Sequence, residues 1–221
     1  MQMYLFDECE GEQYEAPGKA LDLTRLFELS IDAFYAALYA EMSELPVKAE
    51  IERFVEKVVK ASAQGKDARA AAARAATDRG DPDVFVVLGV ADKVRTEIHR
   101  LTGFLRFNPD SEGVYIARCA PDYFILPALA EHFTQRFGEA AWAIIDEKRG
   151  VSLYCENGGP AKLVPVSNSD PSARTEKIAE DFWEELWRLH HRLLSNKARE
   201  NPSLQRQLMP KRYHKYLPEM K

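Results

Sequence analysis

The sequence has few cysteines, no long apolar run and no basic leader. Its three cysteines, Cys9, Cys119 and Cys155, are odd in number and far apart, which argues against a secreted disulfide framework. No stretch approaches the roughly 18 apolar residues of a membrane helix, and residues 1–12 are acidic where a signal peptide is basic. We therefore expect a cytoplasmic protein with no membrane partner.

Signatures of cofactor and metal chemistry are also missing. Gly65-Lys66 lacks the upstream glycine and the following Ser or Thr of a phosphate-binding loop, and no dinucleotide glycine fingerprint follows an expected strand. The cysteines are too far apart for a Cys-x-x-Cys metal site or an iron–sulfur triad. We therefore expect no cofactor and no resident metal.

Charge is distributed unevenly along the chain. The 221 residues carry a net charge of −5. From Ser195 to Lys221, seven basic residues oppose two acidic ones, so this segment carries 7 − 2 = +5 and residues 1–194 carry −5 − 5 = −10. A segment of this charge can bind an anionic partner, or it can fold back onto the acidic body, and composition favours neither interpretation.

The N-terminal half is predicted to be mostly helical. Met3–Phe6 is typical of a short strand. Apolar residues then recur at helical spacing from Leu23 to Leu38 and from Ile51 to Val59, which predicts two amphipathic helices. The alanine-rich segment Lys66–Thr77 has high helix propensity and little capacity to anchor a core, so we expect a packed connector there.

A further helix is predicted from Asp81-Pro82, an N-cap and first-turn proline, to Gly103. Beyond it, four short alternating runs predict antiparallel strands in two hairpins, with a helix at Ile125–Phe137 between them. Ala161–Val166 extends this ββαββ pattern to a fifth strand. The four runs are Phe104–Phe107, Val114–Cys119, Trp142–Ile145 and Val151–Cys155.

The C-terminal part begins with a long helix, predicted from the apolar spacing between Ile178 and Leu193 and ended by Asn201-Pro202. Pro202, Pro210 and Pro218 divide the remaining residues into short pieces, so this tail needs a surface to pack on. We expect an α+β protein with a mostly helical N-terminal region and a sheet of four or five strands. The predicted boundaries are 1–80 for the helical region, 81–200 for the α+β core and 201–221 for the basic tail on the core.

Two groups of polar residues are candidates for chemistry. His132 and Arg136 share a helix face and can offer donors to an anion. Asp146, Lys148 and Arg149 lie in a predicted turn, where a carboxylate beside two cations can orient a substrate. A structural role is the simpler interpretation of both, because lone histidines usually brace a helix and aspartate commonly forms turns. No catalytic residue is assigned, and His132 and Asp146 are the candidates.

Cations beside aromatic residues suggest contacts with nucleic acid. Arg106, between two phenylalanines of an expected strand, can stack on a base or serve as an edge-strand cation. In the tail, cations suit phosphates and tyrosines suit base stacking. The candidate phosphate-binding residues are Arg106, Arg136, Lys148, Arg149, Arg206, Lys211, Arg212, Tyr213 and Lys215.

Several segments, in this order, resemble the domain-of-unknown-function family numbered 4130. The resemblance covers roughly residues 81–221, and the tail is its most specific mark. Members tend to carry histidine at the position of Tyr123 and tryptophan at that of His214, so these departures leave the roles of both positions open. The matching segments are 103–107, 113–117, His132-Phe133 with Arg136-Phe137, 142–149 and 201–216.

This resemblance implies a role in DNA metabolism or DNA repair. Members are often encoded beside a radical-SAM protein likened to DNA-repair enzymes, and some are fused to a uracil-DNA-glycosylase-like domain. The chain has neither a cysteine triad nor a recognisable glycosylase motif, so the resemblance implies a DNA-binding accessory protein, without catalytic activity of its own, for such a partner.

Two alternative functions remain open. The first is an enzyme acting on a nucleotide or damaged base through His132, Arg136, Asp146 and Arg149. The second is a protein-interaction scaffold that binds its partner through the acidic helical residues 1–80.

Overall fold

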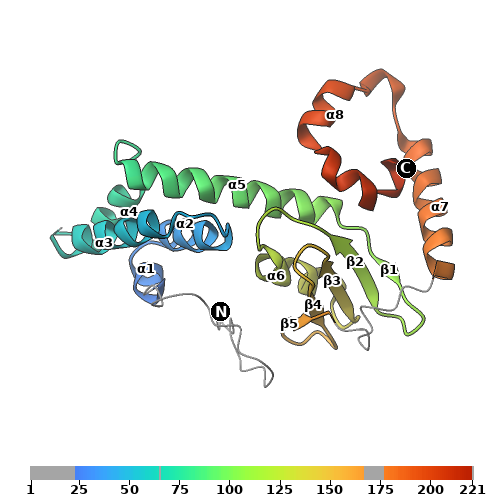
Figure 1. Cartoon of the computed structure of the whole chain (residues 1–221), viewed down its shortest axis with the longest axis horizontal. Helices are drawn as coiled ribbons and strands as arrows, with labels where there is room; N and C mark the ends of the chain where they lie inside the picture. Colours follow the sequence, from blue (N-terminus) through green and yellow to red (C-terminus); the bar gives the residue numbers. More distant parts are fainter. Residues whose placement is uncertain (1–22, 65, 167–176, 221) are drawn as a thin grey trace. The chain divides into compact units, whose positions relative to one another are not determined.

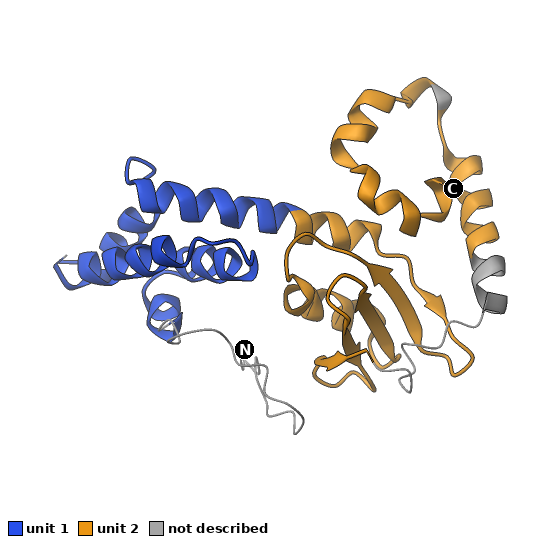
Figure 2. Ribbon diagram, in the orientation of Figure 1, with its two compact units in different colours: residues 1–96 blue, residues 97–221 orange. Residues whose placement is uncertain are grey.

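The computed structural model describes residues 23–64, 66–166 and 177–220 (Figure 1). The strand predicted at Met3–Phe6 lies outside these residues. The chain divides into two compact units, residues 1–96 and 97–221, with the boundary inside one helix (Figure 2). Every helix in the described ranges is too short or too polar to cross a bilayer.

The first unit is helical. One cluster of buried apolar side chains, which includes Phe34, Phe54 and Val58, holds its helices together. The predicted alanine-rich connector forms α4, which packs on α3 through small buried side chains such as Ala72. The elements are α1 (Leu23–Leu29), α2 (Ile31–Met42), α3 (Lys48–Gln64), α4 (Ala68–Thr77) and the first part of α5 (Pro82–Phe104).

The single helix predicted from Leu23 to Leu38 is two helices. Ser30 separates them, and its hydroxyl accepts a hydrogen bond of 3.3 Å from the backbone N–H of Ala33, which caps α2. The apolar spacing continues across this break, so periodicity alone could not locate it.

Helix α5 begins at the predicted residues. The Asp81 carboxylate accepts a hydrogen bond from the Val84 N–H (3.2 Å). At the other end the helix continues one residue past Gly103, and the Leu105 N–H still donates to the Leu101 carbonyl (3.1 Å). The prediction of a strand at 104–107 was therefore wrong, because helical hydrogen bonds hold the start of that segment.

The second unit contains a five-stranded sheet, which confirms the predicted α+β class. The strand order is β1-β2-β3-β4-β5. Neighbours are antiparallel except β2 and β3, which run parallel. The predicted hairpin of β3 and β4 is confirmed, and β1 and β2 form the other, with its first strand at 108–109 instead of 104–107. The prediction that all four strands are antiparallel was wrong for β2 and β3, because α6 (Leu126–Phe137) connects them and a helical crossover returns the chain in the same direction. The strands are β1 (Asn108–Pro109), β2 (Tyr115–Cys119), β3 (Trp142–Asp146), β4 (Val151–Cys155) and β5 (Lys162–Pro165).

Helix α6 supplies aromatic side chains to the core of the sheet. The ring of Phe133 lies 6.1 Å from that of Trp142 and 5.0 Å from that of Phe107. All residues of β3 are buried, so this strand is the centre of the unit and its polar last residue, Asp146, is buried with it.

One long helix and several short ones follow the sheet. The prediction that Asn201-Pro202 ends α7 was wrong, because α7 already stops at Leu194. These residues begin α8 instead: the Asn201 side chain accepts a hydrogen bond of 3.0 Å from the Leu204 N–H, and Pro202 is the first helical residue. The elements are α7 (Lys177–Leu194), η2 (Lys197–Arg199), α8 (Pro202–Leu208), η3 (Lys211–Tyr216) and η4 (Pro218–Met220).

Candidate nucleic-acid interface

The tail is folded back and bound to a buried carboxylate of α5. Oε1 of Glu97 accepts hydrogen bonds from Nη2 of Arg212 (2.8 Å) and from the hydroxyl of Tyr213 (2.6 Å). The backbone N–H groups of Asp122 and Tyr123 donate to the two oxygens of the same carboxylate, each at 3.0 Å. Glu97 is only 1% exposed, and these four donors compensate for the loss of water around its charge.

Tyr213 anchors this contact. The residue is 2% exposed, and its ring lies 5.5 Å from that of Phe104. Burial and then the hydrogen bond to Glu97 raise the pKa of Tyr213, so the hydroxyl stays protonated and donates. The guanidinium of Arg212 lies 4.7 Å from the centre of the same ring. Two of the predicted phosphate-binding residues therefore attach the tail to its own protein.

A second contact joins the tail to Glu147, the residue after β3. The Tyr216 hydroxyl and the Lys215 ammonium donate to its Oε2 at 2.6 and 3.2 Å, and Nη1 of Arg118 lies 3.9 Å from Oε1. Burial raises the pKa of Glu147, but the hydrogen bonds from Tyr216 and Lys215 outweigh burial and lower it. The Lys215 side chain stays 61% exposed, so it faces solvent while it holds the tail.

Arg106 forms a third contact. Its guanidinium stacks 4.8 Å from the centre of the Trp187 ring, and its Nη2 donates to Oε1 of Glu219 at 2.6 Å. The Trp187 indole N–H donates to the other Glu219 oxygen at 2.7 Å. Arg106 thus stacks on an aromatic ring of its own chain.

The β3–β4 turn is held to the loop before α6. Oδ1 of Asp146 accepts the backbone N–H of Lys148 (2.9 Å), and Oδ2 pairs with Nη1 of Arg149 (2.8 Å). Both cationic side chains also donate to the carbonyl of Asp122, at 2.9 and 3.1 Å. The Asp122 carboxylate in turn pairs with Arg212, so the turn and the tail meet at this loop.

His132 and Arg136 lie elsewhere, on the exposed side of α6. Phe133, beside them, packs against Trp142, which begins β3, whereas Asp146 ends it. Four steps along a strand correspond to about 13 Å. Of the four residues of the enzyme hypothesis, Asp146 and Arg149 therefore pair with each other, whereas His132 and Arg136 lie on a different part of the unit.

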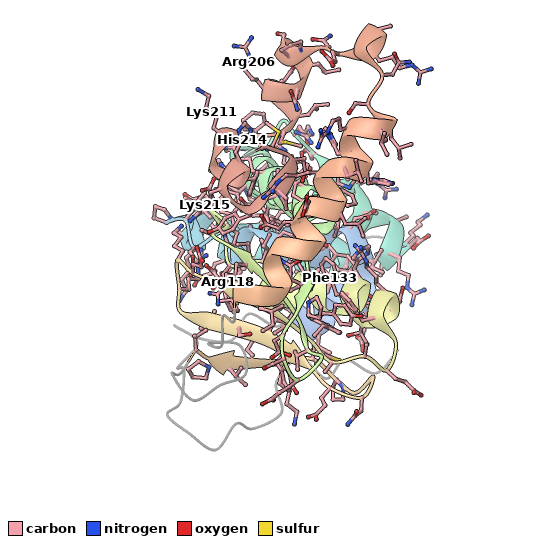
Figure 3. All side chains as sticks on the ribbon, turned by 90° about the vertical axis from the view of Figure 1, so that its right-hand side faces the viewer. Arg118, Phe133, Arg206, Lys211, His214 and Lys215 are labelled. Atoms are coloured by element: carbon pink, nitrogen blue, oxygen red, sulfur yellow. The ribbon has the colours of Figure 1, made fainter. Side chains whose placement is uncertain are left out.

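Arg206 and Lys211 differ from the other cations of the tail. Both are exposed, and neither forms an ion pair with any residue in the described ranges. Nε of Arg206 donates only to the Pro202 carbonyl of its own helix (3.1 Å). In Figure 3, Arg206, Lys211, Lys215 and Arg118 follow one another down the same side of the molecule, and we call them the cationic row.

The carboxylates that form these contacts between the tail and the rest of the unit were not predicted from the sequence. Glu97 had a usable signal, because it falls between Val94 and Leu101 in the apolar stripe of α5, where an unpaired carboxylate is costly. Glu147 and Glu219 lie among other polar residues, and nothing in their spacing distinguishes them.

The described residues contain no cluster of three or more His, Cys, Asp or Glu side chains that could hold a metal ion. Cys119 and Cys155 are buried free thiols. Burial, and then the nearby Asp146 carboxylate, raise the pKa of Cys119, which keeps it protonated and unreactive.

Comparison with known proteins places the chain by family alone. No curated protein and no solved structure matches it. The family described as domain of unknown function DUF4130 matches residues 50–219. This range extends further toward the N-terminus than the resemblance noted in the sequence. Since it spans more than half of the 221 residues, the protein belongs to the DUF4130 family.

Proposed function

We propose that this protein binds nucleic acid through the cationic row and serves in the cytoplasm as an accessory protein of DNA metabolism, without catalytic activity of its own. The observation that carries the proposal is the exposure of Arg206 and Lys211, which have no carboxylate partner in the described ranges. Unpaired surface cations attract phosphates and release counterions on binding.

Docking of the tail supports this proposal. Arg212 and Tyr213 hold the tail by its buried side, so they act as positioning residues and leave the outer cations in place. A ligand then meets cations that are already ordered, which reduces the entropy lost on binding. Lys215, exposed although it is paired with Glu147, can contact a phosphate beside them.

Other candidate residues contribute less to this proposal. Lys148 and Arg149 donate to the Asp122 carbonyl, and Arg106 is stacked on Trp187, so these side chains are occupied. Arg136 is exposed but lies on α6, outside the cationic row.

The resemblance to the family supports the choice of DNA and of a partner. We propose that the protein acts with a radical-SAM protein or a uracil-DNA-glycosylase-like protein, because members are linked to both. This part of the proposal depends on association between proteins and not on the geometry of a site.

The test is a titration of fluorescein-labelled single- and double-stranded DNA, followed by anisotropy at low and moderate salt. We expect binding that weakens with salt, and a loss of about tenfold in affinity for Arg206→Ala/Lys211→Ala. Two fewer phosphate contacts should also reduce the slope of log K against log salt by roughly 1.5.

A matched control removes the same charge elsewhere. Lys60 and Lys93 are exposed lysines of the first unit, so Lys60→Ala/Lys93→Ala lowers the net charge equally and should leave binding within about twofold. No binding by the wild type, or equal losses in the two double variants, would overturn the proposal.

A further inference from the structure

Helix α7 carries a row of exposed leucines. Leu186, Leu189 and Leu193 are 46%, 44% and 73% exposed, and their spacing of three and four residues places them on one side of the helix. Phe182 precedes them by four residues in the sequence. The 4-3-4 spacing is that of a coiled-coil seam, which is narrower than the apolar stripe of a helix packed on a globular core.

The leucine row is not used to fix α7 in its unit. The helix is held by Trp187, whose indole N–H donates to Glu219, and by Arg188, whose Nε donates to the Pro218 carbonyl at 3.2 Å. At about 100° per residue, the leucines lie roughly 100–160° around the helix from Trp187. The described residues therefore hold one side of α7 and leave the leucines partly exposed, Leu193 most of all.

The charges beside the leucine row indicate which helix can pair with α7. Glu185 precedes Leu186 and Arg192 precedes Leu193, so both charges lie on the same flank of the seam. Both are exposed, and neither forms an ion pair with another described residue. When two identical helices pair antiparallel, residues of this flank face each other across the twofold axis. Glu185 of each copy then meets Arg192 of the other.

We propose that α7 is a homodimerisation helix, which pairs antiparallel with α7 of a second copy of this chain. The leucines supply the apolar seam, and the two symmetric ion pairs set its orientation and register. Opposite charges spaced one heptad apart on one flank are complementary to the same flank of a second copy in the antiparallel orientation, which favours self-pairing.

The test is sedimentation equilibrium of the full chain over a concentration series at about 0.15 M salt. We expect a reversible dimer. Glu185→Arg or Arg192→Glu alone turns both ion pairs into repulsive pairs and should weaken the dimer about tenfold or more. The double exchange Glu185→Arg/Arg192→Glu restores complementarity and should return the affinity to within about threefold of the wild type.

Two further variants distinguish association through the leucine row from nonspecific hydrophobic association. Leu189→Asp should abolish the dimer. Leu208→Asp changes an equally apolar, 56% exposed leucine of α8 and should leave the dimer intact. A wild type that stays monomeric up to about 0.5 mM overturns the proposal, because an affinity weaker than this is too low for a specific dimer. Equal effects of the single and double charge exchanges, or of the two leucine variants, overturn it as well.

Discussion

Tyr213→Phe isolates the contribution of one hydroxyl to docking of the tail. The ring stays buried against Phe104, so the change removes only the donor 2.6 Å from Glu97 and the acceptor 2.9 Å from Arg212. A hydrogen bond to a charged group contributes about 1.5–3 kcal/mol. Because Glu97 keeps its other three donors, we expect a loss near the lower end, about 2 kcal/mol.

The matched control is Tyr216→Phe in the same 3-10 helix. Its hydroxyl donates at the same distance, 2.6 Å, but to Glu147, whose side chain is 36% exposed and keeps Lys215 as a partner. Water can replace the lost donor there, so we expect a cost below about 1 kcal/mol. The two variants differ mainly in the burial of the carboxylate that loses its donor, and Tyr213→Phe also removes an acceptor for Arg212.

Urea unfolding followed by tryptophan fluorescence measures both costs, because Trp142, Trp183 and Trp187 all belong to the second unit. Hydrogen exchange adds a local readout at the Tyr213 N–H, which is bonded to the Pro210 carbonyl. A loss of about 2 kcal/mol should accelerate its exchange roughly 30-fold. Equal losses in the two variants, or a loss below about 0.5 kcal/mol for Tyr213→Phe, would refute the account of Glu97 as the main anchor.

Further predictions concern pH and backbone conformation. The hydrogen bond from Arg53, and then that from Lys57, lower the pKa of Asp83 from 3.8 to about 2. The ionised Asp83 carboxylate therefore contributes its full stabilisation above about pH 4, and this stabilisation is lost as the pH falls toward 2. Asp83→Asn should therefore flatten the dependence of thermal unfolding on pH in this window, and an unchanged dependence contradicts the assignment. Gly89→Ala, in the interior of α5 with open space where the added Cβ would lie, should stabilise the protein by about 0.5–1 kcal/mol in urea unfolding. Gly150→Ala should destabilise it by about 1 kcal/mol, because the φ of +65° favours glycine, and a gain at Gly150 would exclude this reasoning.

The elements predicted best are those with one strong local pattern. Asp81-Pro82 and the apolar stripe after it located the start of α5, and the continuous run from Trp142 located β3. Asn201-Pro202 was recognised as a helix boundary, but it was taken as the end of α7 and is instead the start of α8. An asparagine followed by proline can stop the helix before it, and it can equally supply the N-cap and first-turn proline of the next helix.

Strand direction and the tail contacts depended on residues far away in the sequence. The direction of β3 relative to β2 follows from α6 crossing over the sheet, which alternating hydrophobicity does not record. The basic composition of the tail is plain in the sequence, but its local pattern cannot distinguish Arg212 from Lys211. The difference between them is a carboxylate 115 residues earlier, beside Arg212 alone.

The position of Glu97 in the buried stripe of α5 has a consequence for folding during synthesis. Its partner Tyr213 is made 116 residues later, so the ribosome produces the whole sheet before this carboxylate can be covered. Until then only the backbone N–H groups of Asp122 and Tyr123 can bind this carboxylate, and an incompletely compensated buried charge is costly, so this part of α5 should keep its contact with water. Closing so long a loop is slow and entropically costly. We therefore expect this part of the core to close only after η3 has been made.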